Sequence, residues 1–408
     1  MAAYVGHRGG RIVFVSTELI EGNDLEVVPL PKSMKSLDSA RIVREYRVRD
    51  EVLVPIGLPS SGLRLAVVGV YDVPCGIATY TRNLVQALRG LVDDVRVFAE
   101  HEKAEEDPNV VRCWRRGQQT KDLVATLYEY APDLILIQHE YGNFPVARHW
   151  LSLMSALAEY RTLVTLHSVY AHPDKTIVEA ACPEIVVHTD GARRMLKDTK
   201  RIGGNVSVVP HGCPPVSNQS RLWNLYSSDH TVIQFGFGFA YKGWENSIQV
   251  IALLKEQYPD VFFTGLMSER WPGVHAEHAA TLRRLTQKLG VEENVGLVLG
   301  FQSDPVLDSY LRTNRVALFP YREQGEHTVY GCSGAAREAM AKGLPVVVST
   351  VPLFEDLEGV VPRHNTVDGW VSAVAEAFEN GGNVAGQNVF LAENSWSIVA
   401  RKYLDIVM

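Results

Sequence analysis

Small residues and one carboxylate follow each other closely within residues 319–350, in a pattern that could hold an anion. Glycine and other small residues in the turn at 330–334 let the backbone approach a ligand. Ser333 and Gly334 stand where a helix is expected to begin, and the free N–H groups of a helix N-terminus bind phosphate well. Ser333 is equally suited to cap the helix, and the two roles are compatible. Glu338 follows in the second helical turn. The stretch therefore predicts the nucleotide-binding half of an α/β enzyme.

Three further side chains follow expected strands and could act on the same ligand. Lys242 comes directly after a strand, where an ammonium group could neutralise the charge that develops on a leaving phosphate, although an ordinary surface lysine would look the same. His139 and His167 follow two other buried strands. Single histidines are usually structural, but two at neighbouring strand ends favour a site. We therefore treat both as candidate catalytic residues.

Gly76 begins the helix that follows the first buried strand, at residues 65–70. A glycine here often serves only to pack a helix against a strand. It also lets the helix N-terminus face a diphosphate, and its position directly after a first strand favours this second role.

Strands and helices alternate from Arg64 onward, which indicates parallel, doubly wound sheets. The first series of expected strands is 65–70, 94–98, 133–138, 162–166, 184–188 and 207–210. The second series is 232–236, 261–264, 295–299, 316–319 and 346–349, with helices at 248–255 and 276–289. The candidate residues follow the carboxyl ends of these strands, where ligands bind in such folds. The fold class is therefore α/β, with two Rossmann-like domains facing across a cleft.

Composition sets limits on the class of protein. The 408 residues suffice for two domains, and 46% hydrophobic with 21% charged residues is typical of a soluble globular protein. No run of eighteen apolar residues predicts an integral membrane segment, and the first residues lack the apolar core of a signal peptide. A net charge of −7 argues against a general nucleic-acid binder. Five scattered cysteines predict neither disulfides nor structural zinc, so we expect a cytoplasmic protein.

Six stretches together resemble the family 4 type glycosyltransferases of GT-B architecture. They are residues 70–88, 136–144, 164–170, 208–214, 320–349 and 394–407. The resemblance begins near Leu63 and runs to the last residue. It implies a Rossmann-like acceptor-side domain at 63–212 and a nucleotide-sugar domain at 213–393, with a helix at 394–408 crossing back onto the first domain. Residues 1–62 are left as an extension that could form a hairpin or an oligomerisation arm.

The resemblance implies a metal-independent transferase that moves a hexose from a nucleotide-diphosphate sugar, with retention. The sugar nucleotide is a co-substrate, and no bound cofactor is implied. His167 would lie against the transferred sugar and Glu338 would bind the ribose hydroxyls. The leaving phosphate would be held by Gly76, Lys242, Ser333 and Gly334.

Two positions depart from the family pattern. Phe237 stands where the family has an arginine, five positions before Lys242. Tyr330 stands in the donor site where the family has its first glutamate, eight positions before Glu338. Glu326 in the preceding loop, or Glu323, could reach the sugar instead. These changes leave two alternatives open: a degenerate GT-B protein that binds a nucleotide or glycan as a scaffold, or a GT-B sugar-nucleotide epimerase.

The acceptor expected from the resemblance is a saccharide or a lipid-linked molecule, with modified nucleic acid as a further option. A lipid-linked acceptor would be compatible with a protein that lies at the periphery of the membrane. A basic group could contact an anionic acceptor, although most such groups are solvated helix faces. Its members are Arg193, Arg194, Lys197, Lys200 and Arg201.

Overall fold

The computed structural model describes residues 62–101, 107–170, 184–198, 205–217, 228–269 and 273–407. The side chain of Glu326 lies outside this description. Before residue 62 it describes only the backbone of four short strands. These form two antiparallel pairs, β1 (Arg11–Ile12) with β2 (Val28–Pro29) and β3 (Glu45–Arg49) with β4 (Val52–Ile56). They belong to a compact unit of residues 1–63 and 89–94, separate from the rest of the chain.

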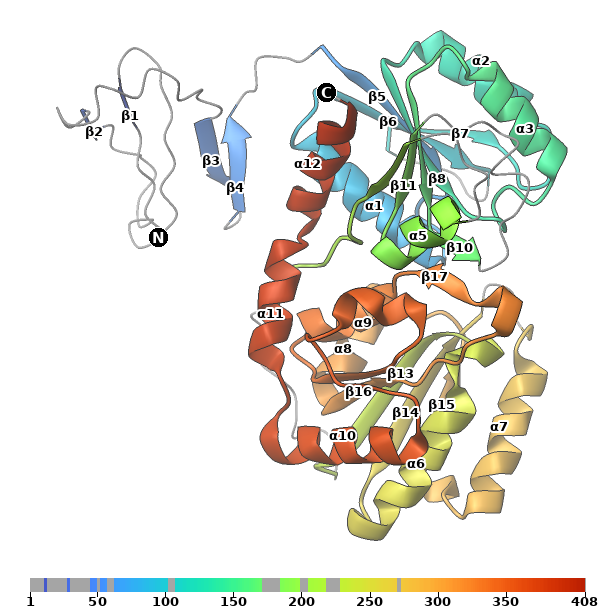
Figure 1. Cartoon of the computed structure of the whole chain (residues 1–408), viewed down its shortest axis with the longest axis vertical. Helices are drawn as coiled ribbons and strands as arrows, with labels where there is room; N and C mark the ends of the chain where they lie inside the picture. Colours follow the sequence, from blue (N-terminus) through green and yellow to red (C-terminus); the bar gives the residue numbers. More distant parts are fainter. Residues whose placement is uncertain are drawn as a thin grey trace. The chain divides into compact units, whose positions relative to one another are not determined.

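The second unit contains two parallel sheets (Figure 1). The first sheet has seven strands in the order β12-β11-β9-β8-β5-β6-β7. They are β5 (Arg64–Gly69), β6 (Asp94–Glu100), β7 (Val110–Trp114), β8 (Leu134–His139), β9 (Thr162–Leu166), β11 (Glu184–Val187) and β12 (Asn205–Val208). All six residues of β8 are buried, as expected for a strand with both faces covered. The helices that connect these strands are α1 (Gly76–Arg89), α2 (Lys121–Tyr130), α3 (Ala147–Ala156) and α5 (Asp190–Asp198).

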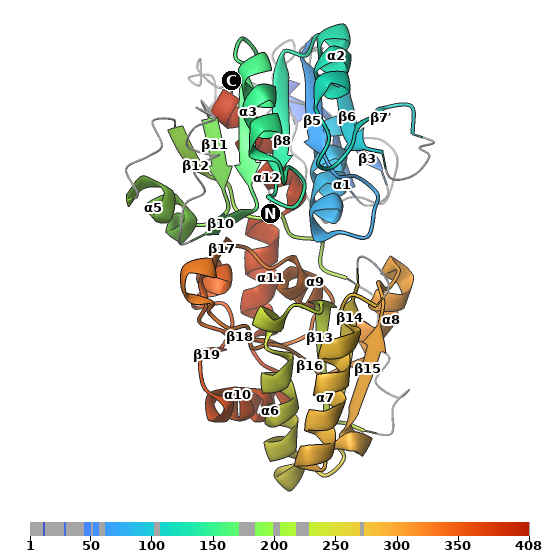
Figure 2. The same cartoon turned by 90° about the vertical axis from the view of Figure 1, so that its right-hand side faces the viewer.

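The second sheet has six parallel strands in the order β15-β14-β13-β16-β18-β19. They are β13 (Thr231–Phe237), β14 (Phe262–Ser268), β15 (Val295–Leu299), β16 (Val316–Phe319), β18 (Val346–Ser349) and β19 (Arg363–His364). Its helices are α6 (Trp244–Gln257), α7 (Ala276–Leu289), α8 (Asp304–Thr313), α9 (Gly334–Ala341) and α10 (Val367–Asn380). Figure 2 shows α6 and α7 side by side along this sheet. Both sheets confirm the predicted α/β class.

Two connections link the sheets. The three-residue strands β10 (Ser168–Tyr170) and β17 (Val329–Gly331) pair antiparallel, so the segment after β9 is bonded to the segment before α9. After α11 (Val384–Glu393), the chain forms α12 (Trp396–Val407), which lies beside the first sheet in Figure 1. The Tyr403 hydroxyl of α12 is 2.9 Å from the Tyr80 hydroxyl and 2.8 Å from Thr165 Oγ1, and all three side chains are buried.

Most of the predicted strands lie where the sequence placed them, and the exceptions have physical causes. The last strand of the first series was predicted at 207–210 but is formed by Asn205–Val208. Pro210 has no N–H group to donate to a sheet, so the strand ends before it. Strands β7, β10 and β17 were not predicted, because each is short and lacks a long apolar run.

Candidate active site

The N-terminus of α9 is built as an anion site would be. Ser333 caps the helix: its hydroxyl oxygen accepts a hydrogen bond from the Ala336 N–H at 3.3 Å. The preceding β17 pairs with β10, which fixes the direction from which the chain enters the helix. A Cβ atom added at Gly334 would lie 3.7 Å from Nε2 of His211, so the imidazole of His211 lies against the first turn. The helix therefore begins among side chains of the first sheet's carboxyl edge.

Lys242 ends the short 3-10 helix η3 (Ala240–Lys242) that follows β13. Its Nζ donates a 2.8 Å hydrogen bond to the hydroxyl of Tyr321 and lies 4.4 Å from the centre of the Tyr321 ring. Burial raises the pKa of Tyr321 far above its usual range, and a hydrogen bond with Ser333 partly offsets this rise. Tyr321 therefore lies between the ammonium group of Lys242 and the cap of α9. This arrangement brings one cation and one helix N-terminus together, as a bound phosphate requires.

Gly236, in β13, lies beside the side chain of Lys242. Gly236 has φ +132°, a conformation that other residues rarely adopt, and a Cβ there would lie 3.5 Å from Lys242 Nζ. The Gln234 side chain also donates a 2.8 Å hydrogen bond to the Lys242 carbonyl. This hydrogen bond joins the backbone of η3 to β13.

Glu338 lies one turn further along α9. Burial raises the pKa of its carboxyl group, the nearby Lys342 and Arg82 lower it, and Asp304 and Asp308 raise it. These four neighbours form two ion pairs, Lys342 with Asp308 and Arg82 with Asp304. No hydrogen bond from another described residue occupies the Glu338 carboxylate, so its oxygens are available to ligand hydroxyl groups.

His167 belongs to a cluster of aromatic and imidazole rings at the carboxyl edge of the first sheet. The Tyr80 ring packs at its centre, with ring centroids 4.6 Å from His167, 5.2 Å from His188, 4.9 Å from His211 and 4.8 Å from Trp396. Burial is the main cause that lowers the pKa of all three imidazoles, that of His188 to about 4. The three histidines are therefore neutral at pH 7.

Comparisons with known proteins agree with this architecture. Residues 231–380 match the family model described as "Glycosyl transferases group 1". Over 85% of this chain and 98% of the other, the structure resembles a sucrose-phosphate synthase from Thermosynechococcus elongatus, with a TM-score of 0.66 at 16% identity. An Anabaena protein solved in complex with UDP matches with a TM-score of 0.61 at 15% identity, over 85% of this chain and 99% of that one. The chain has the GT-B fold.

A curated relative points in the same direction. An uncharacterized glycosyltransferase of Haemophilus influenzae is 23% identical over 174 residues, which are 42% of this chain. The match spans 43% of the length of that relative. Both the family model and this relative thus match part of the chain and agree with its GT-B fold. Among the helices that the structure describes, none has the length and apolar content needed to cross a membrane.

The GT-B structure gives the two candidate histidines different surroundings. His139 is buried, its ring lies parallel to Phe144 at 5.7 Å, and it lies 4.6 Å from the Trp150 ring. His167 instead packs on Tyr80, on the side of the sheet edge that meets α9. His139 thus packs within the aromatic core, whereas His167 lies at the candidate site.

Gly76, Tyr330 and Phe237 have distinct environments. A Cβ atom at Gly76 would meet no described atom within 4 Å, so packing does not explain this glycine. Tyr330 lies in β17 opposite Val169 and packs against the core of the first sheet. Phe237 packs 5.8 Å from Phe239, whose ring stacks on Tyr241 and is 48% exposed. Aromatic packing therefore occupies both positions at which the family pattern has a charged residue.

Sequence analysis missed a buried ion pair behind the α9 cap. The guanidinium group of Arg337 is fully buried and pairs with Asp356, while its second terminal nitrogen donates to the Ser333 carbonyl at 3.0 Å. No sequence pattern marked this pair, because its members are 19 positions apart. The sequence could have predicted His188 as a candidate site residue, because it follows strand β11 just as His167 follows β9.

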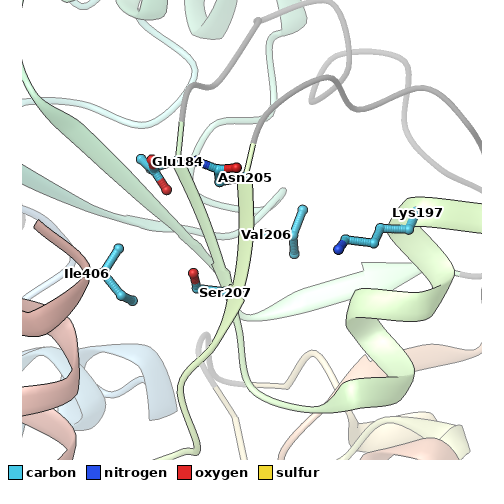
Figure 3. Close-up of a pocket in the computed structure, with 6 residues that line it drawn as sticks. All are labelled: Glu184, Lys197, Asn205, Val206, Ser207 and Ile406. Atoms are coloured by element: carbon cyan, nitrogen blue, oxygen red, sulfur yellow. Dashed lines mark hydrogen bonds between the residues drawn. The ribbon is translucent and has the colours of Figure 1, made fainter.

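A surface hollow among the described residues lies away from this site. It has a volume of ≈ 340 Å³ and is lined by Glu184, Lys197, Asn205, Val206, Ser207 and Ile406 (Figure 3). Glu184 and Asn205 begin β11 and β12, so the hollow lies at the amino ends of these strands, opposite the edge that carries His188. The nearby arginines of α5 are paired, Arg193 with Asp190 and Arg194 with Glu355. The remaining basic residues of this group, Lys200 and Arg201, lie outside the described residues.

Proposed function

We propose that this chain transfers a hexose from a nucleotide-diphosphate sugar to a hydroxyl group of a saccharide or lipid-linked acceptor, with retention and without a metal ion. The observation that carries the proposal is the contact of Lys242 with Tyr321, which in turn meets the capped N-terminus of α9. A cation and a helix N-terminus in one place suit a diphosphate. The UDP complex of the similar Anabaena protein makes UDP the first nucleotide to test.

In the proposed reaction, the bond between the anomeric carbon and the phosphate oxygen breaks, and its electron pair goes to the phosphate. Lys242 and the α9 N-terminus stabilise the negative charge that develops there. The acceptor oxygen bonds to the anomeric carbon on the face that the phosphate leaves, and its proton passes to the departing phosphate. The transition state resembles an oxocarbenium ion, so stabilisation of the leaving group is the main contribution of the protein.

Glu338 and His167 have positioning roles in this proposal. The Glu338 carboxylate accepts hydrogen bonds from the ribose hydroxyls, although burial raises the pKa of this carboxyl group and Lys342 and Arg82 only partly offset the rise. His167, at the edge of the first sheet, contacts the transferred sugar. The open space at Gly76 leaves room for the diphosphate beside the N-terminus of α1.

The test begins with thermal unfolding in the presence of UDP, GDP, ADP and their hexose derivatives. A ligand that binds only the native state at a hundredfold excess over its Kd stabilises by about 2.7 kcal/mol. Release of the nucleoside diphosphate is then followed with each stabilising sugar nucleotide and a panel of saccharide acceptors. Transfer predicts a stabilising sugar nucleotide and acceptor-dependent release. Stabilisation without release under any acceptor would contradict catalysis, and interconversion of sugar nucleotides without release would indicate epimerisation.

A binding scaffold is favoured by one observation, the aromatic residue at position 237. Phe237 is half-buried, so an arginine fits there without emptying a core position. Introducing the family's charge by Phe237→Arg should raise release in a weakened enzyme, but should leave a scaffold inactive. Tyr330→Glu is a poor partner for this test, because Tyr330 packs against the first-sheet core and its loss would also destabilise the fold.

A further inference from the structure

Four groups at the edge of the first sheet form one continuous chain of polar contacts. His188 Nδ1 lies 3.0 Å from the carbonyl oxygen of Val209. His188 Nε2 lies 3.3 Å from His167 Nδ1. His167 Nε2 lies 3.0 Å from the side-chain amide of Gln138. Strands β8, β9 and β11 carry these side chains at their carboxyl ends, so the chain of contacts runs across the sheet.

The Val209 carbonyl fixes where the protons lie. A carbonyl oxygen only accepts hydrogen bonds, so His188 Nδ1 must carry a proton. If the His188 imidazole is neutral, its Nε2 carries a lone pair and accepts a hydrogen bond from the N–H group at His167 Nδ1. His167, if neutral, is left with a lone pair on Nε2.

Gln138 must therefore present its nitrogen to His167. With the amide oxygen facing His167 Nε2, two acceptors would face each other at 3.0 Å, while the amide nitrogen is buried without a partner. Turning the amide by 180° exchanges its oxygen and nitrogen within the same volume. This turn lets the Gln138 N–H donate to His167 Nε2 and ends the meeting of two acceptors, while the amide oxygen takes the buried position in which the nitrogen had no partner.

The alternative is a charged imidazole, on His188 or His167, which would let the Gln138 oxygen accept. His188 is only 2% exposed, and burial lowers the pKa of both rings below the usual range of histidine. The groups facing them do not supply a counter-charge. Tyr80 and Tyr403 are neutral phenols, and His211, Arg337 and His139 act against a further positive charge.

We propose that Gln138 and His188 are positioning residues that hold His167 neutral, with its proton on Nδ1 and its lone pair on Nε2. In the transferase proposed above, on which this role rests, His167 can only accept at Nε2. A donor-sugar hydroxyl that reaches this nitrogen donates its proton to the hydrogen bond and displaces the Gln138 amide. The sugar contact of His167 is therefore an acceptor contact, which a fluorine in place of the hydroxyl cannot reproduce.

The first experiment is a long-range ¹H–¹⁵N NMR spectrum of the ¹⁵N-histidine-labelled full chain at pH 7, without ligand. His167→Gln and His188→Gln variants assign the signals. We expect both imidazoles in the Nδ1–H form. A proton on Nε2 of His167 would overturn the proposal. The NMR spectrum reports the tautomer of His167 without any catalytic activity. The result is therefore valid even if no sugar nucleotide is turned over and the proposed function fails.

Two variants of His188 then separate positioning from mere packing. Glutamine reaches as far as Nε2 of histidine and can accept from His167 Nδ1–H, whereas the shorter asparagine cannot. We expect His188→Gln to keep the His167 tautomer and His188→Asn to lose it, with kcat/KM falling roughly tenfold further, the equivalent of about one net hydrogen bond. His230→Gln, which alters an imidazole paired with Asp260 far from these contacts, is the control. An unchanged His167 tautomer and equal rates in both His188 variants would contradict the proposal.

Gln138→Glu tests the opposite end of this row of polar contacts, at Gln138. A carboxylate only accepts, so it demands a proton on His167 Nε2 and favours the imidazolium form. We expect the His167 signals of this variant to become those of the doubly protonated ring at pH 7. Retention of the neutral Nδ1–H form would mean that the new buried carboxyl group is protonated and donates to Nε2 as the amide does, whereas a neutral ring with its proton on Nε2 would overturn the assignment of the amide.

Discussion

Removing the Asp356 carboxylate should destabilise this protein far more than removing an exposed carboxylate. The Arg337 guanidinium is fully buried, and its contacts include the Asp356 carboxylate, the Ser333 carbonyl at 3.0 Å and the Phe390 ring at 5.6 Å. In Asp356→Ala the cation keeps a neutral acceptor and the face of an aromatic ring, but loses its counter-charge. Breaking a buried pair from one side typically costs about 3–5 kcal/mol.

The reverse change should cost less. Asp356 has 17% of its side chain exposed, so in Arg337→Met the carboxylate can be hydrated or protonated, and the methionine fills much of the emptied volume. We expect about 1–3 kcal/mol for this variant. The double variant should cost less than the sum of the two single variants, because it leaves no charge buried alone.

The measurement is urea-induced unfolding followed by intrinsic fluorescence, with Asp229→Ala as the matched control. Asp229 pairs with Arg315 at 2.8 Å, but its side chain is 80% exposed, and surface pairs contribute only about 0–1 kcal/mol. If Asp356→Ala and Asp229→Ala unfold at the same urea concentration, the argument from burial is refuted. Because α9 starts at Ser333, Asp356→Ala should also weaken nucleotide binding, whereas Asp229→Ala should not.

Three further outcomes are expected. Lys242→Ala should lower kcat about 10²-fold or more, because it removes a charge at the leaving phosphate. Lys255→Ala, on the surface of α6, is the control and should leave kcat unchanged. Equal rates in the two variants would contradict the role of Lys242. Tyr403→Phe removes a buried hydroxyl that bonds Thr165, and it should lower the free energy of unfolding by about 1–2 kcal/mol in a denaturant titration; no change would show that the bond contributes nothing. The pKa of His188 is about 4 in the folded protein and about 6.5 in the unfolded chain, so the unfolded chain binds more protons between these two pH values. The free energy of unfolding should therefore fall by about 3 kcal/mol as the pH is lowered from 6.5 to 4. This pH dependence should be weaker in His188→Gln when the denaturation midpoints at pH 7 and pH 5 are compared.

The repeated strand–helix pattern predicted the two sheets well, because buried parallel strands are short apolar runs that stand out in sequence. The strand Thr162–Leu166 and the helix Ala276–Leu289 have the predicted limits. The GT-B fold is confirmed, while the retaining mechanism and the family 4 assignment stay predictions. Strand ends also marked His167, because ligands of such folds bind at the carboxyl ends of the strands.

What could not be predicted depends on contacts between distant positions. The pairing of β10 with β17 joins residues about 160 positions apart through backbone groups, which carry no sequence signal. The different surroundings of His139 and His167 depend on rings contributed by α1 and α3. The hydrogen-bond partners of His167 follow from the spacing of three strands in the sheet, which no local pattern encodes.

The position of α12 has a consequence for recombination among related genes. Its residues follow the second sheet in the chain, yet Tyr403 completes the buried contacts of Tyr80 and Thr165, and Trp396 fits a space that a side chain at Gly212 would fill. A chimera that exchanges everything after residue 217 would therefore pack the α12 helix of another protein against the first sheet of this one. A chimera that exchanges residues 228–393 alone keeps that helix with its native partners. Viable hybrids of such proteins should have two crossover points, with the second one between α11 and α12.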